Sequence, residues 1–112
     1  MARLIVNALS EDTIAAPGNK RPNYIETSVT TASGVPVTGL NARNFRVDPM
    51  IVGPGGSLVD IKRVAAGRLP GFYHLYVAPI KNRDWKKGKY IFAVAVKKGA
   101  NRGQTLASVE MD

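Results

Sequence analysis

The sequence predicts an all-β protein, a seven-stranded antiparallel sandwich of two sheets. Apolar residues recur at every second position over seven short stretches, which is the spacing of strands with one buried and one exposed face. Glycine, proline and asparagine separate these stretches at intervals of about 8–12 residues, and no segment shows the apolar spacing of a helix. A length of 112 residues is that of one domain, so we expect a single domain over residues 1–112.

The expected strands follow one another with short connections. They lie at residues 2–9, 24–31, 44–52, 58–64, 71–78, 88–97 and 104–111. Pro49 falls inside the third strand and predicts an edge position or a bulge, because proline cannot donate a ladder hydrogen bond. The segment 32–40 contains several glycines and prolines and is expected to cross from one sheet to the other. Residues 97–103 are expected to form a hairpin turn.

The stretch 88–97 is the longest apolar run, and we expect it to be the central strand of the fold. Its larger side chains share the face expected to point into the core: Tyr90, Phe92, Val94 and Val96. The smaller ones share the other face: Ile91, Ala93 and Ala95. This asymmetry predicts a thick core on one side of the strand and a thinner layer on the other.

Composition narrows the class of partner and excludes several kinds of chemistry. The net charge of +8 favours a negatively charged partner such as nucleic acid, anionic lipid, an acidic polysaccharide or an acidic protein. The absence of cysteine excludes disulfides, thiolate metal sites and a cysteine nucleophile.

Hydropathy predicts neither export nor insertion into a membrane. The three consecutive apolar residues at 4–6 are too few for a signal peptide, and no window reaches the ~20 apolar residues of a membrane span. We therefore expect no membrane span, and either a cytoplasmic protein or an excised or mature extracytoplasmic domain.

Several motifs resemble those of bacterial immunoglobulin-like domains. Residues 34–40, followed by 44–47, are similar to the Gly-x-Pro-Val-x-Gly segment and the Phe-x-Val strand of such modules. Residues 71–79 are similar to their penultimate-hairpin strand, and residues 88–94 to their sixth strand. The resemblance covers roughly residues 24–111 and implies an immunoglobulin-like sandwich.

The resemblance also bears on single residues. It implies that Tyr90 makes the corner contact of the fold. Phe92 stands where the family often has cysteine, so the inter-sheet disulfide is absent, and Trp85 lies in a loop rather than on the third strand. Such modules serve adhesins, enzymes, sensors and assembly factors, so the resemblance implies an interaction or spacer module and no particular reaction.

No catalytic constellation stands out in the sequence. His74 is the only histidine, and no nearby pattern of Ser, Asp or Glu provides a partner for general base catalysis, so we expect a surface or sheet-packing histidine. The acidic residues lack the Asp-x-Asp-x-Asp spacing of a calcium loop. Residues 53–56 lack the Lys-Ser/Thr pair and the helix of a phosphate cradle and are expected to be a turn. We expect a protein that is not an enzyme and that uses no cofactor and no metal.

The outward faces of two strands give the candidate interaction surface. Its residues are Phe72, His74 and Tyr76 on the fifth strand and Ile91, Ala93 and Ala95 on the sixth. Aromatic side chains on an outer face suit a protein partner or a sugar ring. The alternative is that the loop 11–22 or a second copy of the chain covers the aromatic stripe.

The basic residues are expected to gather at the two ends of the sandwich, because alternate loops meet at opposite ends. One group is the candidate anion-binding site, in which the tryptophan could stack on a base or a sugar: Lys20, Arg21, Lys81, Arg83, Trp85, Lys86 and Lys87. The other group comprises Arg43, Arg68, Lys97, Lys98 and Arg102. The alternative is that these charges serve solubility alone.

These observations lead to two functional expectations from different classes. The first is a non-enzymatic interaction module that binds a protein partner, or associates with itself as a homo-oligomer, through a sheet face or edge. The alternative is a binder of an anionic polymer, either nucleic acid or an acidic glycan, through the basic loop 81–89.

Overall fold

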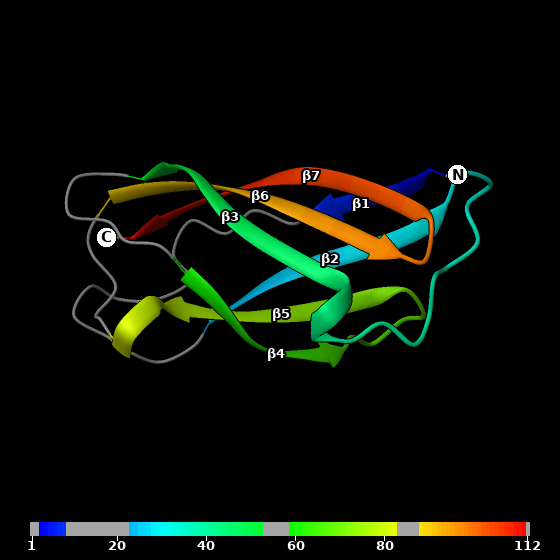
Figure 1. The fold of residues 1–112 in the computed structure, drawn as a ribbon, viewed down its shortest axis with the longest axis horizontal. Helices are drawn as coiled ribbons and strands as arrows, with labels where there is room; N and C mark the ends of the chain where they lie inside the picture. Colours follow the sequence, from blue (N-terminus) through cyan, green and yellow to red (C-terminus); the bar gives the residue numbers. More distant parts are fainter. Residues whose placement is uncertain (1–2, 9–22, 53–58, 83–87, 112) are drawn as a thin grey trace.

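A computed structural model describes residues 3–8, 23–52, 59–82 and 88–111. In these residues the chain forms an all-β sandwich of two antiparallel sheets that face each other (Figure 1). The strands are β1 (Leu4–Ala8), β2 (Asn23–Thr31), β3 (Phe45–Val52), β4 (Val59–Ala66), β5 (Phe72–Pro79), β6 (Gly88–Lys98) and β7 (Asn101–Met111). Two short 3₁₀ turns, η1 (Ala42–Asn44) and η2 (Ile80–Asn82), follow a crossing segment and β5 respectively. The expected all-β two-sheet fold is confirmed.

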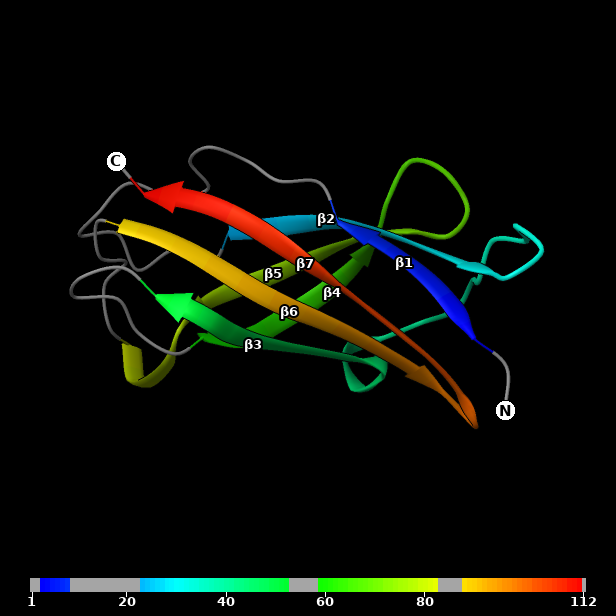
Figure 2. The same cartoon turned by 90° about the horizontal axis from the view of Figure 1, so that it is seen from above.

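One sheet has four strands in the order β1-β2-β5-β4, and the other has three in the order β3-β6-β7. Figure 2 shows the two layers from above, with β1 lying beside β7. A parallel bridge between Arg3 and Arg102 joins the sheets at this edge. Gly103 permits the approach, because a Cβ there would clash with the carbonyl oxygen of Leu4.

The core lies between the sheets and contains the face of β6 that the sequence predicts. Tyr90, Phe92 and Val94 are fully buried and Val96 is 2 % exposed, so the face assignment of this strand is confirmed. The rings of Tyr90 and Phe92 stack with centroids 5.7 Å apart. The four-stranded sheet opposes them with Leu4, Val6, Ile25, Val29, Val59, Tyr73, Leu75 and Val77.

The third strand confirms the prediction made from its proline. β3 is an edge strand of its sheet, and its register with β6 shifts between Pro49 and Ile51. Both features follow from the missing N–H of proline, which a central strand would need for its second ladder.

The segment between β2 and β3 crosses from one sheet to the other, as expected, and Tyr73 of β5 holds it. The Tyr73 hydroxyl donates to the carbonyl oxygen of Val37 at 2.6 Å and accepts from the backbone N–H of Leu40 at 3.3 Å. Val37 and Leu40 are themselves buried. A hydroxyl of one sheet therefore helps to fix the path of the chain into the other, together with the backbone hydrogen bond from Val37 to Val29.

The expected hairpin turn over 97–103 is wrong in its length. β6 runs to Lys98 and β7 begins at Asn101, so Gly99 and Ala100 alone connect them. Gly99 has a φ of +60°, the conformation required at the first central residue of a type II′ turn. The polar residues that read as a loop in the sequence instead pair across the ladder, with Lys97 opposite Arg102.

Candidate functional site

The aromatic stripe of β5 lies on the outer face of the four-stranded sheet. Phe72, His74 and Tyr76 are half-buried and alternate with inward residues that are at most 4 % exposed. Phe72 lies at the hairpin from β4, where its carbonyl oxygen accepts from the N–H of Gly67 at 2.6 Å. The stripe therefore has one end in a turn and the rest on the outer face of the sheet. The loop 11–22, the alternative cover for this stripe, lies outside the described residues.

Two further residues complete an aromatic cluster, which we define as Tyr24, Arg63, His74 and Tyr76. Tyr24 of β2 pairs with Tyr76 in the register, and its ring stacks on His74 with centroids 4.4 Å apart and an interplanar angle of 20°. The Tyr24 and Tyr76 centroids are 5.6 Å apart. Arg63 of β4 places its guanidinium carbon 3.9 Å from the Tyr76 centroid, which is a cation–π contact. Three strands thus contribute to one continuous surface.

Solvent reaches this cluster from one side. Tyr24 is 39 % exposed, whereas His74 and Tyr76 are half-buried by their neighbours. Stacked rings and a stacked guanidinium restrict each other's rotamers, so little side-chain entropy remains to be lost when a partner covers them. The arrangement can bind an apolar or aromatic surface and can donate hydrogen bonds through tyrosine hydroxyls and Arg63.

The other half of the predicted interaction surface lies elsewhere. Ile91, Ala93 and Ala95 are on the outer face of the three-stranded sheet, because their neighbours on β6 point into the core between the sheets. The structure therefore does not bring them together with the β5 stripe. Ala93 lies between Asp48 and Leu106, and Leu106 is 61 % exposed.

The described residues of the two expected basic groups lie at opposite ends of the molecule. Of the candidate anion-binding group the structure describes only Lys81, an exposed residue of η2 with a φ of +56°. The rest of that group lies outside the described residues: Lys20, Arg21, Arg83, Trp85, Lys86 and Lys87. The second group lies together at the far end, near the β4–β5 and β6–β7 turns and η1 (Figure 1).

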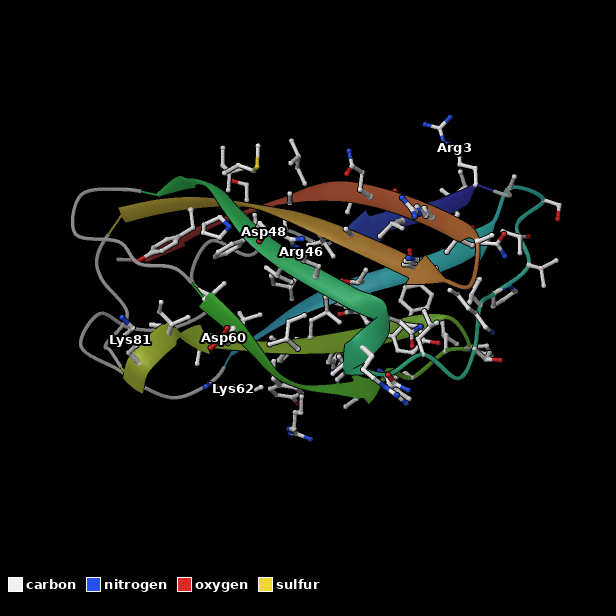
Figure 3. The ribbon with its side chains drawn as sticks, viewed as in Figure 1. Arg3, Arg46, Asp48, Asp60, Lys62 and Lys81 are labelled. Carbon is white, nitrogen blue, oxygen red and sulfur yellow. The ribbon has the colours of Figure 1, made fainter. Side chains whose placement is uncertain are left out.

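Arg3 and Arg46 were not among the basic residues that the sequence assigns to an end. Figure 3 shows Arg3 and Lys81 near opposite ends of the long axis, so Arg3 belongs with the second group. Arg46 points outward from β3, where its Nε lies 2.7 Å from Oδ2 of Asp48. The alternation of Phe45 and Val47 with Arg46 is the signal that places this arginine on an outer face.

The described residues contain no group of three or more His, Cys, Asp and Glu side chains placed to hold a metal ion. In the register His74 lies opposite Glu26, and its ring stacks against Tyr24. Among the helical segments in the described part of the chain, none has the length and hydropathy to cross a membrane.

No protein-family model, curated protein or solved structure matches this chain.

Proposed function

We propose that the protein is a non-enzymatic, immunoglobulin-like interaction module that binds a protein surface through the outer face of its four-stranded sheet. The strand order supports the immunoglobulin-like assignment. If β1 to β7 are lettered A to G, the sheets read A-B-E-D and C-F-G, the arrangement of a seven-strand constant-type domain. The corner role of Tyr90 within that scheme stays a prediction.

The observation that carries the functional proposal is the aromatic cluster. Tyrosine and arginine are enriched among the residues that contribute most to binding at protein interfaces, and tyrosine buries a large area at low cost in rotamer entropy. Tyr24 and Arg63 both contact Tyr76 on the outer face of the four-stranded sheet. We therefore place the centre of the interface on this cluster.

The sheet edges favour a face over an edge as the binding surface. β3 carries Pro49 and a register shift, and β4 has a register shift between Ile61 and Arg63 together with the exposed Lys62. Proline, bulges and edge lysines all hinder the addition of another strand. On the remaining side, β1 lies against β7 at the bridge between Arg3 and Arg102.

The test compares two surface variants with the same fold. Tyr24→Ala combined with Tyr76→Ala removes most of the cluster, and Leu106→Ala on the opposite outer face serves as the control. Sedimentation velocity over a wide concentration range measures self-association. A photo-crosslinking residue in place of Tyr24, used in cells, detects a different protein partner.

The proposal expects association that the double variant loses and the control keeps, and cross-linking from position 24 that is absent from position 106. A protein that stays monomeric at every concentration and cross-links equally from both positions would rule out this surface. Equal thermal melting of both variants confirms that the loss of binding is not a loss of folding.

A further inference from the structure

A groove of about 750 Å³ lies at the end of the molecule that carries Arg3, and it is lined by basic side chains. It lies where β1 meets β7, beside η1 and the last residues of β6. Five of its lining residues are cations: Arg3, Arg43, Arg46, Lys97 and Arg102. None of the described residues that line it is acidic.

The strand register places three of these cations side by side. Arg102 is directly opposite Lys97 in the β6–β7 ladder, and Arg3 is bridged to Arg102 from β1. All three are exposed, and the bridge places Arg3 next to the three-stranded sheet that carries the other two. Like charges directly opposite each other destabilise a sheet. This repulsion therefore destabilises the protein without an anion relative to the protein with an anion bound.

Within the described residues, little opposes these charges. Arg46 is the one cation of the groove with an ion pair in that part of the chain, to Asp48. Arg43 is held on the rim because Asn41 caps η1 and the Asn44 side-chain amide donates to the carbonyl oxygen of Lys97 at 2.9 Å. The groove therefore presents four fixed or closely spaced positive charges that lack a carboxylate partner in the described structure.

The chemistry of the lining identifies the kind of anion. Four of the five cations are arginines, whose planar fork matches two oxygens of a phosphate. Among the described residues of the lining the only aromatic one, Phe45, is 6 % exposed, so none of them offers a ring to stack on an unpaired base or a sugar. Such a lining suits closely spaced phosphates whose bases are hidden from the protein.

We propose that this groove binds the phosphodiester backbone of a nucleic-acid duplex without reading its sequence. The proposal is independent of the aromatic cluster on the outer face of the four-stranded sheet and of Lys81, which lies at the other end of the molecule. Four unpaired cations that each displace a counterion predict a salt dependence of log K on log salt with a slope of about −3 to −4.

The test uses the full chain and a short fluorescein-labelled DNA duplex of mixed sequence. Fluorescence anisotropy measures binding between about 50 and 200 mM salt. Lys97→Glu is the informative variant, because a glutamate opposite Arg102 relieves the repulsion in the ladder while it repels phosphates. Its melting temperature should equal or exceed that of the original protein, while affinity falls about tenfold or more and the slope loses about 1–2 units.

Lys62→Glu is the matched control, since it makes the same change in net charge on the edge strand of the other sheet. Its affinity for the duplex should stay within about threefold of the original. An equal loss in both variants would show attraction by net charge alone and overturn the site. Absence of duplex binding at the lowest salt, or tighter binding of heparin or of a single-stranded oligonucleotide of the same length, would overturn the ligand.

Discussion

Replacing Tyr73 by phenylalanine isolates one hydroxyl that holds the segment crossing between the two sheets. The hydroxyl donates to the carbonyl oxygen of Val37 and accepts from the N–H of Leu40, and both residues are buried. The ring keeps its place in the core, against Phe45 with centroids 5.4 Å apart. The substitution therefore changes hydrogen bonding and leaves packing almost unchanged.

The magnitude follows from the two groups left without a partner. A buried backbone group that loses its hydrogen bond costs about 1–3 kcal/mol. The bond to Val37, at 2.6 Å, is short and the bond to Leu40, at 3.3 Å, is long, so the first should contribute most of the loss. We expect Tyr73→Phe to lower the free energy of unfolding by about 2–3 kcal/mol.

Urea denaturation and hydrogen exchange measure this effect together. If the free energy of unfolding falls with urea by about 1.5 kcal/mol/M, the midpoint of denaturation should fall by about 1.3–2 M. The amide of Leu40 should exchange faster than other amides of comparable burial, because it alone loses its acceptor. Tyr76→Phe, on the outer face of the same strand, should change stability by less than about 0.5 kcal/mol. Equal midpoints for the two variants, with unchanged exchange at Leu40, would refute the anchoring role of Tyr73.

Two other substitutions test the core. Phe92→Ala should lower the free energy of unfolding by about 3–5 kcal/mol in a denaturant melt, because Phe92 is fully buried and its loss leaves a cavity. Ile91→Ala, on the half-buried face of β6, should lower it much less. A loss under about 1 kcal/mol for Phe92→Ala would mean that the faces of β6 are inverted. Thr27 is fully buried, and its hydroxyl has no hydrogen-bond partner in the described structure. Thr27→Val should therefore raise the free energy of unfolding by about 1 kcal/mol in the same assay. A decrease of similar size would reveal a hydrogen bond to that hydroxyl.

The sequence was most informative about features that depend on the residues of a single strand. The faces of β6 follow from the sizes of alternate side chains, and the edge position of β3 follows from Pro49, because each depends on local geometry alone. The crossing between sheets over 32–40 was predictable for the same reason, since glycine and proline mark it locally.

Features that depend on which strands pair were not predictable from one sequence. Tyr24 and Tyr76 become neighbours only because β2 pairs with β5, which is not the next strand along the chain. The anchoring role of Tyr73 depends on its hydrogen bond to Val37, which precedes it by 36 residues. Ile91 and Tyr76 both read as outward apolar positions, but the strand order assigns them to opposite faces of the sandwich.

The length of one turn shows how such a pairing can create a candidate site. As part of the expected turn over 97–103, Lys97 and Arg102 would lie at a loop tip, where two long side chains can separate and relieve their repulsion in water. The two-residue turn at Gly99 instead extends both strands and holds these charges directly opposite each other. The parallel approach of β1, which Gly103 permits, then adds Arg3 beside them. Composition alone leaves open whether this net charge serves an anionic partner or solubility; backbone geometry concentrates part of it in one positive groove, which is the site that we propose for an anion.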